Sequence, residues 1–166
     1  MLRTNKGKFN MESIIYSCER YNPYTSNTCF IIADEREIIS SPTYLHTFKD
    51  KLSKKEYGVI SDNIGISMPY LKTEKEFIVG TSQYMYFFDF ASKKAERKLL
   101  NSPCEILVIS HNKIIAICEC DVVIMSASDK QIVAELEFND VIADYKILQN
   151  SLSLSLMEGK EYKINL

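Results

Sequence analysis

The feature that most constrains the fold of this chain is the stretch 84–90, which reads Tyr-Met-Tyr-Phe-Phe-Asp-Phe. Successive side chains of an extended strand point to opposite faces. Here one face carries Met85 and Phe87, and the other carries Tyr84, Tyr86, Phe88 and Phe90. A strand that is apolar on both faces needs cover on both sides. The stretch therefore predicts a central strand of a sheet.

Ten strands are predicted between residue 76 and the C-terminus. Their apolar runs, several of them alternating, are separated by short polar turns, and short turns join antiparallel neighbours. The predicted ranges are 76–82, 84–90, 96–100, 105–110, 113–119, 122–126, 131–138, 141–148, 151–157 and 161–166. This half of the chain is thus expected to be antiparallel β-structure.

The first half is expected to contain strands at 12–19, 28–33, 37–40 and about 59–67, together with one amphipathic helix at 42–57. Ser41 can cap this helix, Pro42 suits its first position, and Gly58 can end it. Its apolar stripe consists of Tyr44, Leu45, Phe48 and Leu52. With 166 residues and 46% hydrophobic residues, we expect a single folded domain, in which 1–58 supplies strands and the helix and 59–166 the repetitive strands.

A short repeat lies within the strand-rich half. Ala-Ser-Lys-Lys at 91–94 recurs as Ala-Ser-Asp-Lys at 127–130, and the same offset of 36 residues superimposes the strands that follow. Four short strands in about 40 residues is the dimension of one propeller blade. Residues 57–166 therefore resemble blades of the WD-repeat kind, although the sequence contains no Trp.

This resemblance implies a mainly β fold whose antiparallel strands form blade-like repeats. Three closures are open: a partial propeller, a sandwich or a barrel. In the first of these, the strand at 12–19 would pair beside the strand at 161–166. In the others, the sheets stay open or close differently.

Several kinds of chemistry have no signature in the sequence. It has two histidines, His46 and His111, and lacks a Gly-x-Ser-x-Gly motif, a phosphate-binding loop and a dinucleotide fingerprint. Cys104, Cys118 and Cys120 with His111 could in principle bind zinc, but free cysteines are also common small core residues. We expect a protein that is not an enzyme and that needs no cofactor or metal.

Charge and hydropathy narrow the expected partners and compartment. The formal net charge is −2, which provides no positive field for nucleic acid. No apolar run approaches the ~20 residues of a membrane helix. Five cysteines without a regular framework, and no apolar leader, are typical of a reducing, cytoplasmic location.

Acidic and tyrosine side chains at turns and strand edges are the candidate partner-binding residues. Carboxylates attract a basic partner, and tyrosine is enriched at binding hot spots. The candidates are Glu35, Glu37, Tyr84, Tyr86, Glu119, Asp121, Asp140 and Asp144. They predict a non-catalytic protein-binding module.

In general character the chain is similar to immunity proteins of bacterial contact-dependent-inhibition systems. This resemblance implies a monomer or homodimer that blocks a basic toxin domain, such as a nuclease. One alternative is an adaptor or scaffold fragment of a larger propeller. A third is an unrecognised enzyme with a pocket around His111, Glu119 and Asp121.

Overall fold

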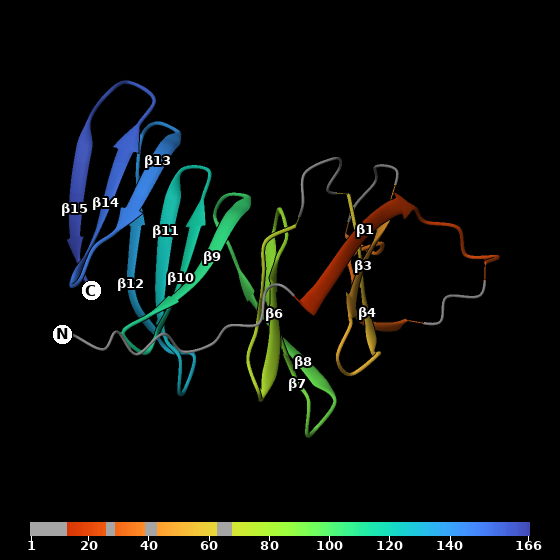
Figure 1. Ribbon diagram of the computed structural model, residues 1–166. Helices are drawn as coiled ribbons and strands as arrows, with labels where there is room; N and C mark the ends of the chain where they lie inside the picture. The colour runs from red at the N-terminus through yellow and green to blue at the C-terminus, as the bar shows by residue number, and fades with distance from the viewer. Residues whose placement is uncertain (1–12, 26–28, 39–42, 63–67) are drawn as a thin grey trace. The chain divides into compact units, whose positions relative to one another are not determined.

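The computed structural model describes residues 13–25, 29–38, 43–62 and 68–166. The described residues form fifteen strands (Figure 1). These are β1 (Ile14–Arg20), β2 (Phe30–Asp34), β3 (Tyr44–Asp50), β4 (Glu56–Ser61), β5 (Tyr70–Lys72), β6 (Glu76–Gly80), β7 (Tyr84–Asp89), β8 (Lys94–Leu99), β9 (Cys104–Ser110), β10 (Lys113–Cys118), β11 (Asp121–Ser126), β12 (Ile132–Glu137), β13 (Ile142–Ile147), β14 (Ser151–Leu156) and β15 (Glu161–Asn165). The mainly β class is confirmed.

The strands form four sheets, labelled here in chain order. Sheet A has the order β1-β3-β4-β2, sheet B β5-β6-β7-β8, sheet C β12-β11-β10-β9 and sheet D β13-β14-β15. The registers within the sheets are antiparallel except between β2 and β4, which run parallel. Sheets B, C and D each use consecutive strands, because each short turn reverses the chain beside the strand before it.

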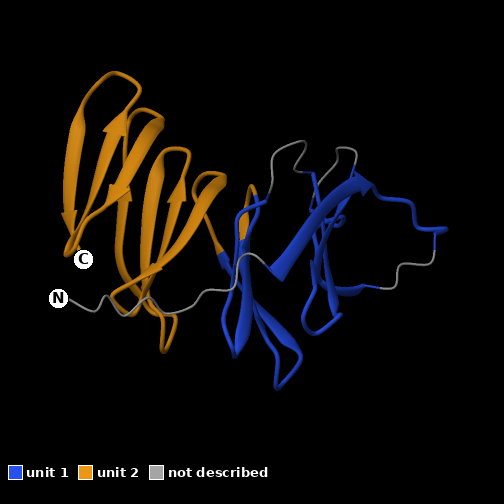
Figure 2. Ribbon diagram, in the orientation of Figure 1, with its two compact units in different colours: residues 1–81, 85–98 blue, residues 82–84, 99–166 orange. Residues whose placement is uncertain are grey.

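The chain divides into two compact units (Figure 2). Unit 1 comprises residues 1–81 and 85–98, and it contains sheet A and most of sheet B. Unit 2 comprises residues 82–84 and 99–166, with sheets C and D. The single-domain organisation stays a prediction.

The prediction that 84–90 forms a central strand is confirmed. β7 lies between β6 and β8 in sheet B, and residues 85–88 are buried. In unit 1 its Phe88 lies 5.0 Å from the ring of Phe30 and 5.8 Å from that of Tyr57. Phe48 and Phe77, both fully buried, join the sheets deeper in the unit with a ring distance of 5.1 Å. Aromatic packing of sheet A on sheet B thus forms the core of unit 1.

The predicted helix at 42–57 is wrong. β3 and the start of β4 occupy this segment, with a hairpin turn between them. His46 and Phe48 alternate on one buried face of β3, Leu45 is buried on the other face, and Leu52 lies in the turn and is 69% exposed. His46 is a core residue there: the Tyr16 hydroxyl lies 2.8 Å from Nδ1. The segment forms a strand because β1 and β4 pair with it on both sides.

Gly58 does not end a helix but lies inside β4. A Cβ atom at this position would lie 2.6 Å from Ile31 Cδ1 and 2.8 Å from Cys29 Sγ. The glycine therefore allows the β2 side chains to approach the sheet closely. Ser41 and Pro42, the expected helix start, lie outside the described residues.

The predicted strands have different outcomes in the two halves of the chain. All ten predicted from residue 76 onward are confirmed as β6 to β15, with ends shifted by at most two residues. The strands at 12–19 and 28–33 are confirmed as β1 and β2 over their described residues, and 59–61 belong to β4, whereas residues 12, 28 and 63–67 lie outside the described ranges. Instead of a hairpin strand at 37–40, residues 36–38 form a turn, and 39–40 lie outside the described residues. β5 was not predicted.

The repeat predicted from sequence corresponds to a recurring hairpin turn. The same kind of turn contains Lys54, Lys93 and Lys130. The backbone amide of each lysine donates to the carbonyl oxygen of the residue four positions earlier, over 2.8, 2.9 and 3.0 Å. Each has a positive φ, of 60°, 56° and 60°. Lys93 and Lys130, which occupy the same position of their turns, are 37 residues apart. This is one residue more than the offset of 36 between the two similar sequences. Sheets B and C are therefore successive copies of one four-stranded unit.

Sheet D is apolar on one face and polar on the other. Leu152 and Leu154 of β14 are buried in a core cluster with Ile115 and Ile124 of sheet C. The alternate residues include Ser153 and Ser155, which line a hollow of about 480 Å³ with lysines and carboxylates.

No closed ring forms among the described strands. β1 pairs with β3, and β15 pairs with β14 at the end of sheet D. The expected pairing of the strand at 12–19 beside the strand at 161–166 is therefore absent from the described sheets.

Candidate protein-interaction surface

The edge strand β12 of unit 2 combines exposed apolar and acidic side chains. It ends sheet C, so within the described sheets it has one strand neighbour, β11. Ile132 is 48% and Val133 56% exposed, and Glu135 and Glu137 are exposed further along the strand. We call these four residues the β12 surface. An edge strand offers backbone groups to an incoming chain, and exposed apolar area adds hydrophobic contact.

Asn101 holds the two carboxylates of the β12 surface together. Its Nδ2 atom donates to Glu135 Oε1 over 3.0 Å and to Glu137 Oε1 over 2.9 Å. The two glutamates lie on the same face because they are two residues apart on one strand. The arrangement concentrates negative charge beside the exposed valine. Like charges across a sheet edge are unfavourable, so the surface disfavours pairing with itself and favours a basic partner.

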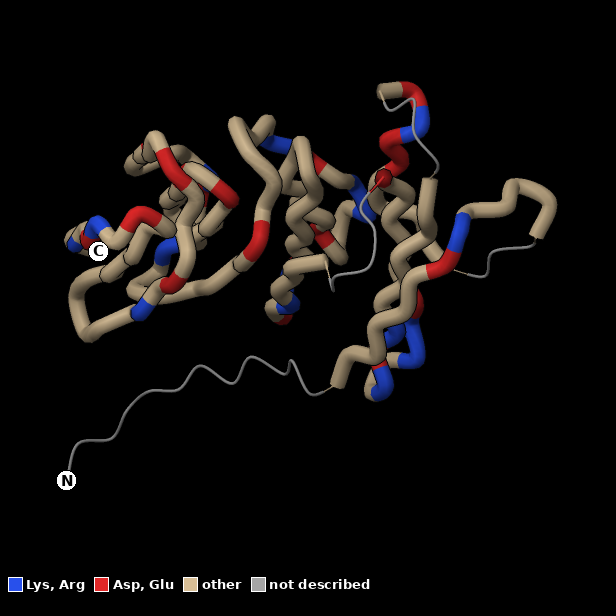
Figure 3. The backbone as a smooth tube through the Cα atoms, turned by 90° about the horizontal axis from the view of Figure 1, so that it is seen from above, with Lys and Arg blue, Asp and Glu red and all other residues tan. Residues whose placement is uncertain are grey.

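The charge of unit 2 reinforces this preference. Residues 82–84 and 99–166 contain ten Asp and Glu and five Lys, a formal side-chain charge of −5. The remaining residues contain 15 Lys and Arg and 12 Asp and Glu, a charge of +3. Figure 3 marks these charged positions along the chain. The near-neutral total thus conceals two units of opposite charge.

Among the candidates expected to bind a partner, Asp121 has an internal position. It is 1% exposed; one carboxylate oxygen accepts a hydrogen bond from Ser102 Oγ, and the other has no hydrogen-bond partner among the described residues. Ser102 Oγ in turn accepts from the amide of Cys120 over 3.1 Å. Cys118 is buried nearby, and its contact with Cys104, burial and Asp121 all raise the pKa of its thiol. Cys104 and Cys118 form part of the interior.

Three acidic candidates of unit 2 lie at least partly at the surface. Glu119 and Asp144 are exposed, and Asp140 is half-buried. Asp140 accepts from the amides of Val141 and Glu158, over 2.8 and 2.6 Å, so it fixes two turns. Burial is the largest cause that raises the pKa of the Cys120 thiol. The negative charges of Glu119, Asp121 and Asp140 raise this pKa further, so the three carboxylates lie near Cys120. Their partner-binding role stays a prediction.

The unit 1 candidates Glu35 and Tyr86 contact each other inside the protein. Glu35 is 1% exposed; its Oε1 accepts from Tyr86 over 3.0 Å and from Thr81 over 2.7 Å, while Oε2 has no hydrogen-bond partner among the described residues. Burial raises the pKa of this carboxyl, although both hydrogen bonds act in the opposite direction. Glu35 therefore connects the segment after β2 to sheet B. Glu37 is exposed and Tyr84 half-buried.

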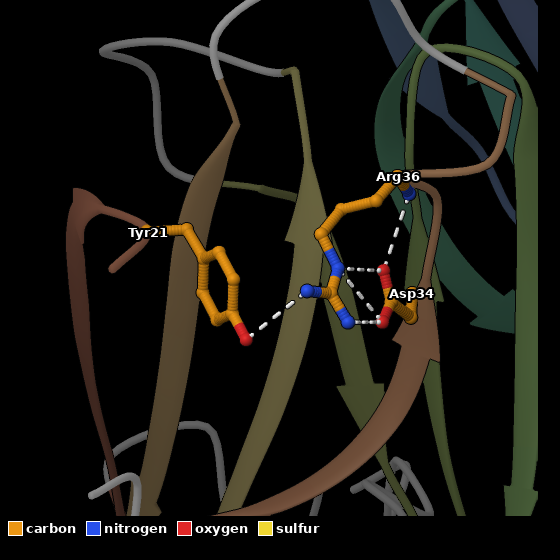
Figure 4. A network of polar contacts seen from close by, with 3 residues as sticks. All are labelled: Tyr21, Asp34 and Arg36. Atoms are coloured by element: carbon orange, nitrogen blue, oxygen red, sulfur yellow. Dashed lines mark hydrogen bonds and ion pairs between the residues drawn. The ribbon is translucent and has the colours of Figure 1, made fainter. Parts of the chain in front are cut away.

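A surface network missed by sequence reasoning flanks Glu35 (Figure 4). Arg36 Nε and Nη2 donate to Asp34 over 2.8 and 2.5 Å, and Nη1 donates to Tyr21 OH over 3.3 Å. The guanidinium also lies 4.7 Å from the centre of the Tyr21 ring. The hydrogen bonds from Arg36 lower the pKa of Asp34. Asp34 and Arg36 are exposed and bound to each other at the surface, whereas Glu35 between them points into the interior.

Two further findings concern metal and membrane. Within the described ranges, no three His, Cys, Asp or Glu side chains gather closely enough to hold a metal ion. A search of the same residues for helices finds none with the length and apolar character needed to cross a membrane.

Comparison with known proteins identifies similar folds at low sequence identity. No protein-family model and no curated protein matches the chain. The computationally designed protein Ika4 matches with a TM-score of 0.55 and 9% identity, over 85% of this chain and 94% of Ika4. Sqt1 of Saccharomyces cerevisiae, of the WD-repeat propeller type, matches with a TM-score of 0.54 and 11% identity, over 74% of this chain and 39% of Sqt1. The chain is thus similar in fold to propeller-type proteins.

Proposed function

We propose that this chain is a non-catalytic protein-interaction scaffold. The observation that carries the proposal is the β12 surface, where an edge strand presents exposed Ile132 and Val133 beside the paired carboxylates of Glu135 and Glu137. Such an edge suits a partner segment that adds as a strand and brings Lys or Arg to the glutamates. The similarity in fold to propeller-type proteins supports this proposal.

A second candidate function is the immunity protein, in which the partner is a single basic toxin domain. The formal charge of −5 on unit 2 favours it, because complementary charge speeds encounter with a basic partner. The two functions differ in the number and nature of partners. A scaffold binds several proteins, whereas an immunity protein binds one that is toxic when expressed alone.

The test is affinity capture from the native host with the tagged full chain and two charge-reversed variants. One variant is E135K/E137K, which changes the β12 surface. The matched control is E105K/E161K, which reverses two exposed glutamates on the edge strands β9 and β15. We expect stoichiometric partners with the wild-type chain and the control, and their loss with E135K/E137K. Equal capture by both variants would reject the β12 surface, and no capture by the wild type would reject the scaffold proposal.

A further inference from the structure

Unit 1 contains a pocket of about 490 Å³ that neither the sequence motifs nor the β12 surface explains. It is lined by Phe30, Lys54, Lys55, Glu56, Tyr57, Phe88, Phe90 and Lys93. Its volume lies within the ~300–1,000 Å³ of typical ligand sites. We call it the aromatic-lysine pocket.

The apolar part of the pocket is made of aromatic rings from both sheets of unit 1. Phe30 of β2 packs 5.0 Å from Phe88 of β7, and Tyr57 of β4 packs 5.7 Å from Phe90. Tyr57 and Phe88 are buried, whereas Phe30 is 47% exposed. An aromatic or large aliphatic side chain inserted here would remove the exposed ring of Phe30 from water, which is favourable.

The polar part is dominated by three exposed lysines from two hairpin turns. Lys54 and Lys55 lie in the turn between β3 and β4, and Lys93 lies between β7 and β8. Among the described residues, no ion pair is formed by any of the three. Glu56, the only acidic residue of the lining, pairs instead with Lys49 over 2.7 Å. The pocket therefore has a surplus of positive charge beside its aromatic rings.

The chemistry of the turns favours carboxylates over phosphates as the anions. Phosphate sites usually supply backbone amides as donors, but here the Lys54 and Lys93 amides already donate to Asp50 O and Asp89 O. The Ser92 amide donates to the Asp89 side chain over 2.6 Å, so this amide is occupied as well. A cation is disfavoured by the lysines themselves. Single carboxylates, each meeting one ammonium group, fit best.

We propose that the aromatic-lysine pocket docks an acidic peptide segment of a partner protein. One aromatic or large aliphatic side chain of the segment packs against Phe30 and Phe88, and neighbouring Asp or Glu side chains pair with Lys54 and Lys93. This site lies in the other unit and selects the opposite charge from the β12 surface. The pocket proposal therefore goes beyond the scaffold proposal. The outcome of the peptide-binding experiments does not decide the outcome of the affinity capture that tests the β12 surface, and the reverse is also true.

The first experiment is selection of random 12-residue peptides displayed on phage against the full chain, after removal of binders to a K54E/K93E variant. We expect the enriched sequences to contain an aromatic or large aliphatic residue next to at least two Asp or Glu. Enrichment of basic sequences, or no enrichment over the K54E/K93E variant, would overturn the proposal.

The second experiment measures fluorescence anisotropy of the most enriched peptide with matched variants. K51E/K94E is the control, because it reverses one exposed lysine near each of the same two hairpin turns, outside the pocket lining, and changes the net charge equally. We expect affinity to fall at least tenfold for K54E/K93E and less than threefold for the control, provided that both melt at the wild-type temperature. Equal losses would overturn the proposal. So would displacement of the peptide by ATP at micromolar concentration.

Discussion

Lys54 and Lys93 share a left-handed backbone conformation, with φ of 60° and 56°, and both line the aromatic-lysine pocket. This region is unfavourable for most residues with a Cβ, whereas Gly adopts it freely and Asn adopts it more readily than Lys does. Two hairpins of different sheets thus retain lysine where other residues would be more stable, and at both places the side chain reaches the same pocket.

Replacing these lysines should therefore have opposite effects on the stability of the fold and on the affinity for the peptide. We expect Lys54→Asn and Lys93→Asn each to raise the free energy of unfolding by about 0.5–1 kcal/mol, as relief of left-handed strain. Both should weaken binding of the acidic peptide. Lys130, at the equivalent position of unit 2, is the control: Lys130→Asn should leave peptide binding unchanged. Urea denaturation measures the stability, and destabilisation by both pocket variants would contradict the explanation.

The ion pair between Asp50 and Lys72 links sheets A and B within unit 1. The two groups are 2.6 Å apart, with the Asp50 side chain fully buried and that of Lys72 21% exposed. Burial alone would raise the pKa of Asp50, but hydrogen bonds from Lys72, Ser53 and the Leu52 amide outweigh it and hold the pKa well below its usual range. We expect Lys72→Met to cost about 2–3 kcal/mol, because it leaves a buried carboxylate without its cation.

The ion pair between Asp50 and Lys72 also makes the free energy of unfolding decrease at acid pH. Since the folded-state pKa of Asp50 is lowered, its contribution is present above the unfolded pKa and is lost as pH falls through that value towards the folded one. Chemical denaturation between pH 7 and pH 3 should show a smaller loss for Lys72→Met than for the wild type. Parallel curves would show that the pair is not responsible.

Glu35 should have the opposite pH dependence. Burial raises its folded-state pKa, so its contribution is fully present below the unfolded pKa and is lost as pH rises through the folded pKa. Glu35→Gln keeps an oxygen that accepts from Thr81 and Tyr86 and removes the charge. We expect this variant to melt above the wild type at pH 8, with a smaller difference at pH 4.5. A lower melting temperature at both pH values would indicate that the charged form is required.

Gly58 provides a test of the strand that replaced the predicted helix. We expect Gly58→Ala to cost about 1–2 kcal/mol by overpacking, because the new Cβ would lie 2.6 Å from Ile31 Cδ1. Ile31→Val shortens that side chain, so the double variant should recover part of the loss. Additive losses in a double-mutant cycle of denaturation free energies would contradict the contact.

The strands of the C-terminal half could be predicted because local signals agree there. Apolar alternation in segments such as 151–156 coincides with short turns on both sides, and each strand pairs with its neighbour in sequence. Residues 42–57 lacked this agreement, since Tyr44, Phe48 and Leu52 fit helical spacing as well as strand spacing, and Leu45 interrupts the strand alternation. The parallel pairing of β2 with β4 depends on contacts between distant segments, which periodicity does not report.

The candidate surfaces were less predictable than the fold. Glu35 and Asp121 looked like surface carboxylates because acidic residues are rarely buried, and no local pattern reveals the hydroxyl groups that accompany them inside. The aromatic-lysine pocket had no signal in the sequence, because its rings come from separate segments that include β2, β4 and β7. Glu135 and Glu137 were not among the candidates, and no sequence pattern indicates that Asn101 joins them.

The most direct test of the scaffold proposal is hydrogen–deuterium exchange of the full chain with and without a captured partner. If the partner adds at the β12 surface, amide protection should increase in residues 131–138, while β10 in the interior of sheet C should be unchanged. The E135K/E137K variant, mixed with the same partner, should show no added protection. Protection confined to other segments, with 131–138 unaffected, would contradict the central claim.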